Sequence, residues 1–315
     1  MDTDQTAANV GAPMLEHKNR AALVGSHFSE VFVDSDSAAC SPSAAAALAN
    51  SHSLLMVNAL ASAAECEKLR KLAEPAALRE QADMEGRPDL WTSERPRGQA
   101  RKLGRVRLPV REAGLLGEEG RVLCDQLLLR TLRLLQAELP ELVERLFGPC
   151  LAGDACSATA TTQGVAQEMK RGSGMFVGLC SSAEPSLERQ GAVGGGGGGD
   201  GNPVPLNVSR LAFAPLEPAV NVYWAGGAFK RHEDKQALTV LVPLSDGYEG
   251  GGTGFWTRER AATGASHAPT FVLRPPPGTA LVWGGQVEHA GLPVISGERW
   301  VFVASFSPAA EGAVG

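Results

Sequence analysis

Residues 219–244 have the sequence AVNVYWAGGAFKRHEDKQALTVLVPL, in which two apolar runs flank a Gly-Gly turn and a polar segment. Short apolar runs bounded by turn residues are typical of buried β-strands. Three more runs of this kind follow at residues 270–273, 279–283 and 300–306. Regularly spaced short strands predict a β-sandwich or barrel for this part of the chain.

The chain before this β region carries helix signals. Residues 54–57 form a short apolar run suited to a strand, and Ser62 and Glu65 then have the spacing of a capping box. The capping box predicts a helix over residues 63–74. Leucines recur at three- and four-residue steps over residues 118–147, which predicts a helix that Pro140 kinks or splits. We therefore expect an α+β chain, mainly β, with helices packed on one face of the β unit.

Composition shifts divide the chain. Residues 1–50 are rich in Ala, Ser and Asp with a weak apolar pattern, so we expect a disordered or weakly structured extension. Residues 51–308 read as one domain, followed by a short tail at residues 309–315. We divide this domain into a helical lead-in at 51–149, a Gly-rich insertion at 150–206 and a β core at 207–308.

The overall composition limits the classes of function. The 315 residues carry a net charge of −6, which argues against a nucleic-acid-binding polycation. No apolar run approaches the length of a membrane span, and the polar, acidic start lacks the pattern of a secretory signal. The six cysteines show no CxxC spacing and fit a reduced compartment. We expect an intracellular, cytoplasmic protein with no nucleic-acid or membrane partner.

Two histidines of the β region lie near predicted strand ends. His232 and Asp234 are two residues apart, so they point to one face of an extended chain, and His289 follows another apolar run. Two histidines and one carboxylate make the facial triad of non-haem Fe(II) oxygenases, which leaves open positions on the metal. A lone His-x-Asp also occurs at surface turns, so the residues around it decide whether it is read as a metal site.

Arg299 opens the last apolar run. A guanidinium that points into an apolar barrel needs an anion, because a buried unpaired charge is very costly. Its planar fork suits a carboxylate bidentately. That carboxylate belongs either to a ligand or to an acidic residue of the chain.

Four blocks in order resemble prolyl 4-hydroxylase-like 2-oxoglutarate/Fe(II) dioxygenases. Residues 223–234, YWAGGAFKRHED, resemble the family pattern YxxGGx[YF]xxHxD, and residues 249–255, EGGGTGF, resemble EGGxTxF with an extra Gly. Residues 277–283, PGTALVW, resemble PxGxALxF, and residues 289–300, HAGLPVISGERW, resemble HxxxPVxxGx[KR]W. The resemblance implies a double-stranded β-helix, also called a jelly roll, with supporting N-terminal helices.

The resemblance also implies a site and a reaction. It implies His232, Asp234 and His289 as Fe(II) ligands, Arg299 as the partner of the distal carboxylate of 2-oxoglutarate, and contacts from Tyr223 and Thr253 to this co-substrate. The implied reaction uses O₂, hydroxylates an unactivated C–H and releases succinate and CO₂, with ascorbate keeping the iron reduced. Collagen-type prolyl 4-hydroxylases usually carry Lys where Arg299 stands. The substrate implied is a peptide or protein residue such as proline, with a small molecule as the alternative.

Other residues have two interpretations. Trp224 and Trp256 could line a substrate groove, or they could be core or strand-surface aromatics, since aromatics favour strands. Seven basic residues could form an anionic-substrate or nucleic-acid patch, or a solvated loop and edge strand. We favour the loop and edge strand, because no stacking aromatics interleave with them. The seven are Arg95, Arg97, Arg101, Lys102, Arg105, Arg107 and Arg111.

Two rival functions remain at this stage. A non-catalytic jelly roll that binds a ligand or partner has no need to keep His232, Asp234, His289 and Arg299 together. A cupin-type metal enzyme that does not use 2-oxoglutarate has no need of Arg299 and Tyr223 as a clamp for a distal carboxylate. We therefore expect the dioxygenase.

Overall fold

The structure is a computed structural model. It describes residues 22–24, 28–32, 43–85, 104–112, 114–148, 208–256 and 268–309. These residues belong to one compact unit, which comprises residues 1–151 and 206–315. The Gly-rich insertion, the end of the tail and residues 95–102 of the basic segment lie outside the described residues.

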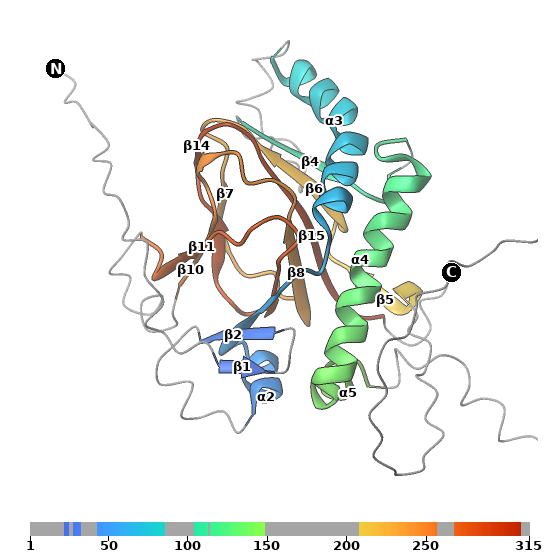
Figure 1. Ribbon diagram of the computed structural model, residues 1–315, viewed down its shortest axis with the longest axis vertical. Helices are drawn as coiled ribbons and strands as arrows, with labels where there is room; N and C mark the ends of the chain where they lie inside the picture. Colours follow the sequence, from blue (N-terminus) through green and yellow to red (C-terminus); the bar gives the residue numbers. More distant parts are fainter. Residues whose placement is uncertain are drawn as a thin grey trace, which may run out of the picture. The chain divides into compact units, whose positions relative to one another are not determined.

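A nine-stranded antiparallel sheet forms the larger layer of the fold (Figure 1). Its order is β1-β2-β3-β12-β8-β15-β6-β4, and β5 also pairs with β15. The strands are β1 (Ala22–Val24), β2 (Phe28–Phe32), β3 (Ser53–Val57), β4 (Arg105–Pro109), β5 (Leu211–Phe213), β6 (Ala219–Tyr223), β8 (Leu238–Pro243), β12 (Ala280–Gly284) and β15 (Arg299–Pro308).

A smaller sheet faces the inner side of the larger one. Its order is β11-β10-β13-β7, and β14 and β9 form a separate pair. These strands are β7 (Phe229–His232), β9 (Glu249–Gly250), β10 (Thr253–Phe255), β11 (Phe271–Leu273), β13 (His289–Gly291) and β14 (Val294–Ser296). The chain passes between the two sheets, and the fold is the mainly β, double-stranded β-helix that the sequence predicted.

Both faces of the larger sheet are buried. Leu241 and Val301 pack between the sheets with Phe255 and Trp283 of the inner cluster. Residues of the opposite face, such as Phe302, pack against the helices. A strand buried on both faces reads as a continuous apolar run, which explains why all six residues of β8 are buried.

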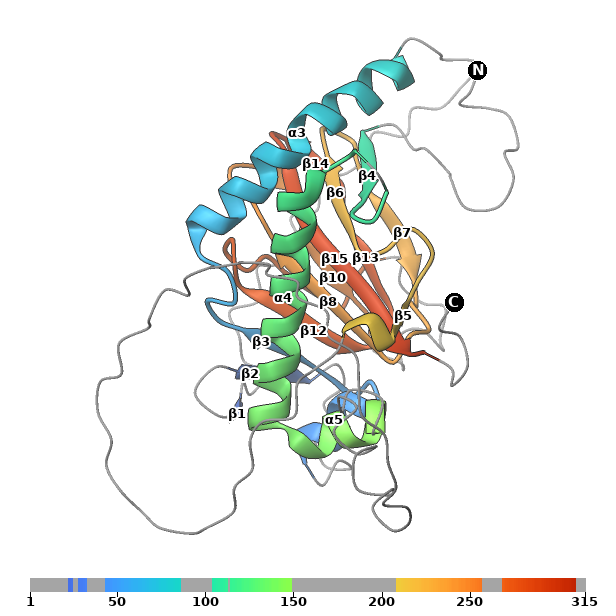
Figure 2. The ribbon, with the colours of Figure 1, turned by 90° about the vertical axis from the view of Figure 1, so that its right-hand side faces the viewer.

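Helices α3 (Ala63–Glu85) and α4 (Gly117–Glu138) cover the outer face of this sheet (Figure 2). The predicted capping box begins α3, because Ser62 Oγ accepts from the Glu65 amide at 3.2 Å and the Ser62 amide donates to Glu65 Oε2 at 2.9 Å. The helix continues eleven residues past the predicted end at residue 74, because buried Ala76 and Ala77 hold the turns beyond Pro75 against the core.

The leucine-rich segment forms two helices, as Pro140 predicted. Pro140 is the first residue of α5 (Pro140–Phe147), and Leu139 between the helices leaves the helical conformation with φ −134° and ψ 57°. A proline at a first helical position loses no hydrogen bond, whereas within a helix it would. None of the described helices is both long and apolar enough to cross a membrane.

Part of residues 1–50 forms regular structure, which differs from the weakly structured extension expected there. Strand β2 pairs with β3 along the whole of β3, and the Val31 side chain is buried in the inner cluster. The pairing covers what would otherwise be an exposed sheet edge. Ser43 caps the short helix α2 (Ala44–Ala49) through a 3.2 Å bond from the Ala46 amide.

Candidate active site

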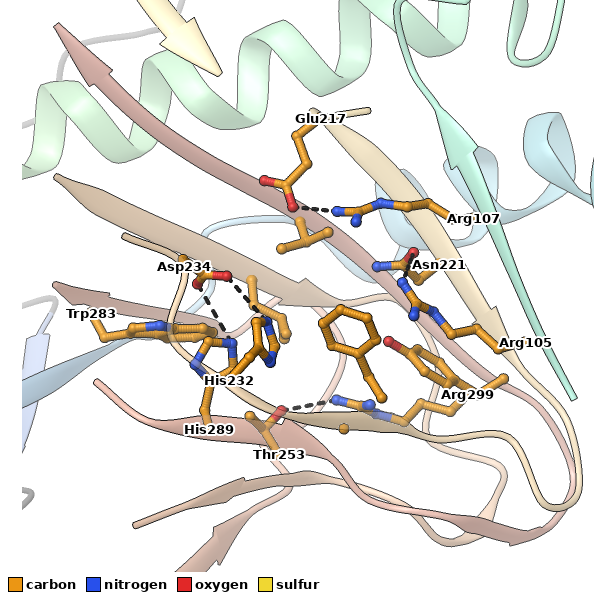
Figure 3. A pocket seen from close by; sticks show the side chains of 15 residues that line it. Arg105, Arg107, Glu217, Asn221, His232, Asp234, Thr253, Trp283, His289 and Arg299 are labelled. Atoms are coloured by element: carbon orange, nitrogen blue, oxygen red, sulfur yellow. Dashed lines mark hydrogen bonds and ion pairs between the residues drawn. The ribbon is translucent and has the colours of Figure 1, made fainter. Parts of the chain in front are cut away.

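A pocket lies between the two sheets, and polar side chains from both of them point into it (Figure 3). It encloses about 410 Å³ of space free of atoms, including the part open to solvent. His232, Asp234, His289, Arg299, Tyr223 and Thr253 all line this pocket.

The three proposed metal ligands converge at one end of the pocket. His232 ends β7, His289 begins β13, and the two residues are directly opposite each other in the strand register. Asp234 lies 3.3 Å from His232 Nε2 through Oδ1 and 3.5 Å from His289 Nε2 through Oδ2. One ligand atom from each residue lies within 4.8 Å of the others, so the set can hold a metal ion.

Hydrogen bonds to the backbone orient both imidazole rings. His232 Nδ1 lies 2.7 Å from the Lys230 carbonyl oxygen, and His289 Nδ1 lies 2.9 Å from the Val287 carbonyl oxygen. A carbonyl only accepts, so each Nδ1 carries the proton and each Nε2 keeps its lone pair. Metal-binding histidines show this arrangement because the second bond fixes the ring and its tautomer.

The electrostatic surroundings keep the ligands in metal-binding form. Burial raises the pKa of the Asp234 carboxyl, but the neighbouring His232 and His289 side chains and the Thr239 hydroxyl outweigh burial and lower the pKa to about 2. Burial lowers the pKa of His289, which favours the neutral imidazole that binds metals. Thr239 Oγ1 donates to Asp234 Oδ2 at 2.6 Å and lies 3.1 Å from Ser305 Oγ.

Arg299 lies in the same pocket at the start of β15. Its side chain is buried, and Nη2 donates to Thr253 Oγ1 at 2.9 Å. Its Cζ lies 5.2 Å from the ring centroid of Tyr223, the residue opposite it on β6. Among the described residues it has no carboxylate partner, so the acidic-residue alternative finds no support there.

Residues 218–306 match the family described as the 2OG-Fe(II) oxygenase superfamily. The matched segment contains the His-Asp-His cluster and Arg299. This segment of the chain is similar to 2OG-Fe(II) oxygenases. Fe(II), 2-oxoglutarate and O₂ are the metal and co-substrates that this family implies. No curated protein matches the chain.

Solved structures similar to the chain include several oxygenases of low sequence identity. A Burkholderia pseudomallei oxidoreductase of the 2OG-Fe(II) oxygenase family is 20% identical, with a TM-score of 0.24 over 29% of this chain and 44% of that one, so the match spans less than half of that structure. A viral collagen prolyl hydroxylase from Paramecium bursaria Chlorella virus-1 is 13% identical, with a TM-score of 0.37 over 82% of this chain and 96% of the other. AviO1 from Streptomyces viridochromogenes is 12% identical, with a TM-score of 0.43 over 82% and 90%.

The structure adds residues to this pocket that the sequence analysis did not assign to it. Arg105 and Arg107 of β4 line the pocket, with Glu217 and Asn221 beside them. Strand β4 is the edge strand we expected, but these two side chains are partly buried and were wrongly expected in solvent. In the alternation RVRLP the two arginines alternate with buried Val106 and Leu108, which indicates that the arginines share one face of the strand but not that this face borders a pocket.

The pocket does not include Trp224 or Trp256 among its described lining residues. Trp224 packs against the outer cluster, and its indole Nε1 donates to Glu298 Oε1 at 3.0 Å. Trp256 is buried, with the Arg231 guanidinium 4.7 Å from its ring centroid. The structure therefore places both indoles outside the described lining of this pocket.

Proposed function

We propose that this chain is an Fe(II)- and 2-oxoglutarate-dependent dioxygenase that hydroxylates an unactivated C–H and releases succinate and CO₂. One observation carries the proposal: a His-Asp-His cluster and a buried arginine without a carboxylate partner among the described residues line the same pocket. A cupin-type enzyme or a non-catalytic jelly roll would need the cluster or the arginine, but not both.

In this proposal His232 and His289 hold the metal through Nε2 and Asp234 holds it through its carboxylate. The residues fit the group, because both Nε2 atoms face the carboxylate and both Nδ1 atoms are occupied by backbone carbonyls. When bound, the iron supplies the oxidative chemistry that couples decarboxylation of 2-oxoglutarate to C–H hydroxylation. Ascorbate is proposed as the reductant that keeps the metal as Fe(II).

Arg299, Thr253 and Tyr223 are proposed to bind the distal carboxylate of 2-oxoglutarate. The guanidinium offers a planar pair of donors to a carboxylate, and Thr253 already fixes its position through Nη2. The Tyr223 phenol can donate a third hydrogen bond. The apolar side chains of Leu241, Trp283 and Val303 line the same space and exclude water from these polar groups.

The substrate that we propose to test first is a peptidyl residue such as proline. Support comes from the four sequence blocks over residues 223–300, which resemble prolyl 4-hydroxylases. A small molecule is the second class. Turnover of 2-oxoglutarate with and without proline-containing peptides tests the choice, and a peptide that speeds succinate release identifies the class.

Binding of 2-oxoglutarate tests the clamp. With Mn(II) in place of Fe(II), Arg299→Gln should weaken 2-oxoglutarate binding by about 30- to 1,000-fold, because a charge-assisted pair in a buried site contributes about 2–4 kcal/mol. Arg299→Lys keeps the charge and should lose less affinity for 2-oxoglutarate. Isothermal titration calorimetry measures both. Equal affinity in wild-type protein and Arg299→Gln would contradict the assignment.

A further inference from the structure

Two arginines of the pocket lie outside the residues that match the oxygenase family, on strand β4 of the lead-in. The register places Arg105 beside Tyr223 and Arg107 beside Asn221, and it places Arg299 on the other side of Tyr223. Residues two apart on a strand share a face, so both β4 arginines point to the side of the sheet that holds the metal cluster. Figure 3 shows both guanidiniums on this side.

The two arginines differ in their partners. Arg107 forms an ion pair with Glu217. Arg105 has no carboxylate partner among the described residues, and its hydrogen bond from Nη2 to Asn221 Oδ1 is long at 3.5 Å. In both arginines Nε is buried without a hydrogen-bond partner among those residues, so the carboxylate of Glu217 is what distinguishes them. The positive charge of Arg107 is therefore balanced by a carboxylate in this pocket, whereas the charge of Arg105 is not.

Aromatic rings hold the Arg105 guanidinium close to the metal cluster. Its Cζ lies 3.9 Å from the ring centroid of Phe229, and the Phe229 ring packs edge-on against His232 with centroids 4.3 Å apart. One phenyl ring thus separates this cation from a proposed iron ligand. The same guanidinium lies 5.6 Å from the Tyr223 ring, whose other neighbour is Arg299.

The charges that line the pocket indicate the charge of the ligand that Arg105 would bind. The described residues that line the pocket include three cations, Arg105, Arg107 and Arg299, and two anions, Glu217 and Asp234. The two charges of Fe(II) and the two of 2-oxoglutarate offset each other, so one positive charge remains in the loaded pocket. A monoanion would neutralise it, whereas a phosphate monoester carries a charge of about −1.5 to −2.

We propose that Arg105 binds a carboxylate of the hydroxylated substrate beside the iron site. This proposal rests on the dioxygenase function proposed above. The carboxylate can belong to a free amino acid or other small acid, or to the C-terminus or an acidic side chain of a peptide. A neutral internal peptide segment would bury Arg105 without a partner, which is unfavourable.

The test uses pairs of ligands that differ only in the carboxylate. Wild-type protein loaded with Mn(II) and 2-oxoglutarate is titrated by calorimetry with small acids and their amides: L-proline and L-prolinamide, N-acetyl-L-proline and its amide, and benzoate and benzamide. A proline-ending peptide and its C-terminal amide form the peptide arm, and inorganic phosphate is the dianion control. We expect at least one acid to bind tenfold or more tightly than its amide, and the arm in which this occurs identifies the source of the carboxylate.

Variants then assign the preference to Arg105. Arg105→Gln should reduce the acid-to-amide ratio below twofold while changing the 2-oxoglutarate dissociation constant by less than twofold, and Arg105→Lys should keep part of the ratio. Arg111→Gln is the matched control, because Arg111 lies against Phe213 and does not line the pocket. Circular dichroism checks that each variant is folded.

Four outcomes would overturn the proposal: no acid outbinds its amide, phosphate outbinds every acid, Arg105→Gln keeps the wild-type ratio, or Arg105→Gln weakens 2-oxoglutarate as much as Arg299→Gln does. The last outcome would place Arg105 in the co-substrate clamp. If wild-type protein binds no 2-oxoglutarate at all, the dioxygenase function itself fails. The two failures are therefore distinguishable.

Discussion

The proposed iron ligands are oriented by residues that do not touch the metal. Backbone carbonyls hold the two imidazoles, and the Thr239 hydroxyl holds Asp234. Thr239 is fully buried on β8, and it also contacts Ser305 on β15. The carboxylate is therefore fixed by the larger sheet, and the histidines come from the smaller one.

Thr239→Val should weaken metal binding. The valine keeps the shape of the side chain but removes the donor to Asp234 Oδ2, and loss of such a supporting contact typically costs about 10- to 100-fold in metal affinity. Thr239→Ser keeps the hydroxyl and should bind the metal nearly as tightly as wild-type protein does. Titration with Mn(II) followed by electron paramagnetic resonance measures both, and wild-type affinity in Thr239→Val would contradict the role of this bond.

At the scale of elements, two junctions connect the start of α3 to other parts of the fold. Arg130 of α4 donates to the Leu60 carbonyl oxygen at 3.1 Å and pairs with Glu65, the capping residue of α3. Gly278, in the turn before β12, donates its amide hydrogen to the Pro243 carbonyl oxygen at 3.0 Å and accepts from the Ala61 amide at 3.1 Å. Both junctions meet near the start of α3.

The Glu65–Arg130 pair should contribute to stability above pH 4.5 and lose this contribution as the pH falls. The hydrogen bond from Arg130 is the main cause that lowers the pKa of Glu65 from 4.5 to about 2 in the folded chain. The unfolded chain therefore takes up the proton first, and folding weakens between pH 4.5 and 2. Urea unfolding at pH 7 and pH 3 should show a smaller pH-dependent loss in Glu65→Gln, by about 1 kcal/mol. Glu74→Gln, on the exposed face of α3, should match wild type.

Gly278→Ala should destabilise the chain more than a change at another glycine with a similar φ. Gly278 has φ +84°, and a Cβ there would lie 2.0 Å from the Ala61 carbonyl oxygen. Gly114 has φ +85° with no atom within 4 Å of a Cβ, so Gly114→Ala should cost only the backbone strain of about 1–2 kcal/mol. We expect Gly278→Ala to cost about 1–3 kcal/mol more, because backbone must move. Equal midpoints in chemical unfolding would contradict this prediction.

For the whole molecule, ligand binding and folding should be coupled. The pocket is built from strands distant in sequence, so the unfolded chain lacks it, and ligands stabilise the folded state by mass action. Mn(II) and 2-oxoglutarate, each at 100 times its dissociation constant, should each add about 2.7 kcal/mol. Asp234→Asn should lose most of the Mn(II) effect in differential scanning fluorimetry. An unchanged melting temperature in wild-type protein with both ligands would argue against the site.

Sequence reasoning predicted the parts of the molecule whose signal is local. The alternation of turns and apolar runs predicted the β core, and the capping box at Ser62 and Pro140 predicted helix boundaries. The orientation of Arg105 depends on the pairing of β4 with β6, which lies more than 100 residues further along the chain. The same alternation RVRLP fits a solvated edge strand equally well, so only the pairing decides. The pairing of β2 with β3 was missed for the same reason.

The most direct test of the central claim is release of succinate from 2-oxoglutarate by purified protein with Fe(II), O₂ and ascorbate. Wild-type protein should release succinate slowly without substrate and faster with an acceptable one, and Asp234→Ala should release none above background. Succinate release that persists in Asp234→Ala would contradict the account. So would wild-type protein that binds iron and 2-oxoglutarate but releases no succinate with any of the peptides and acids.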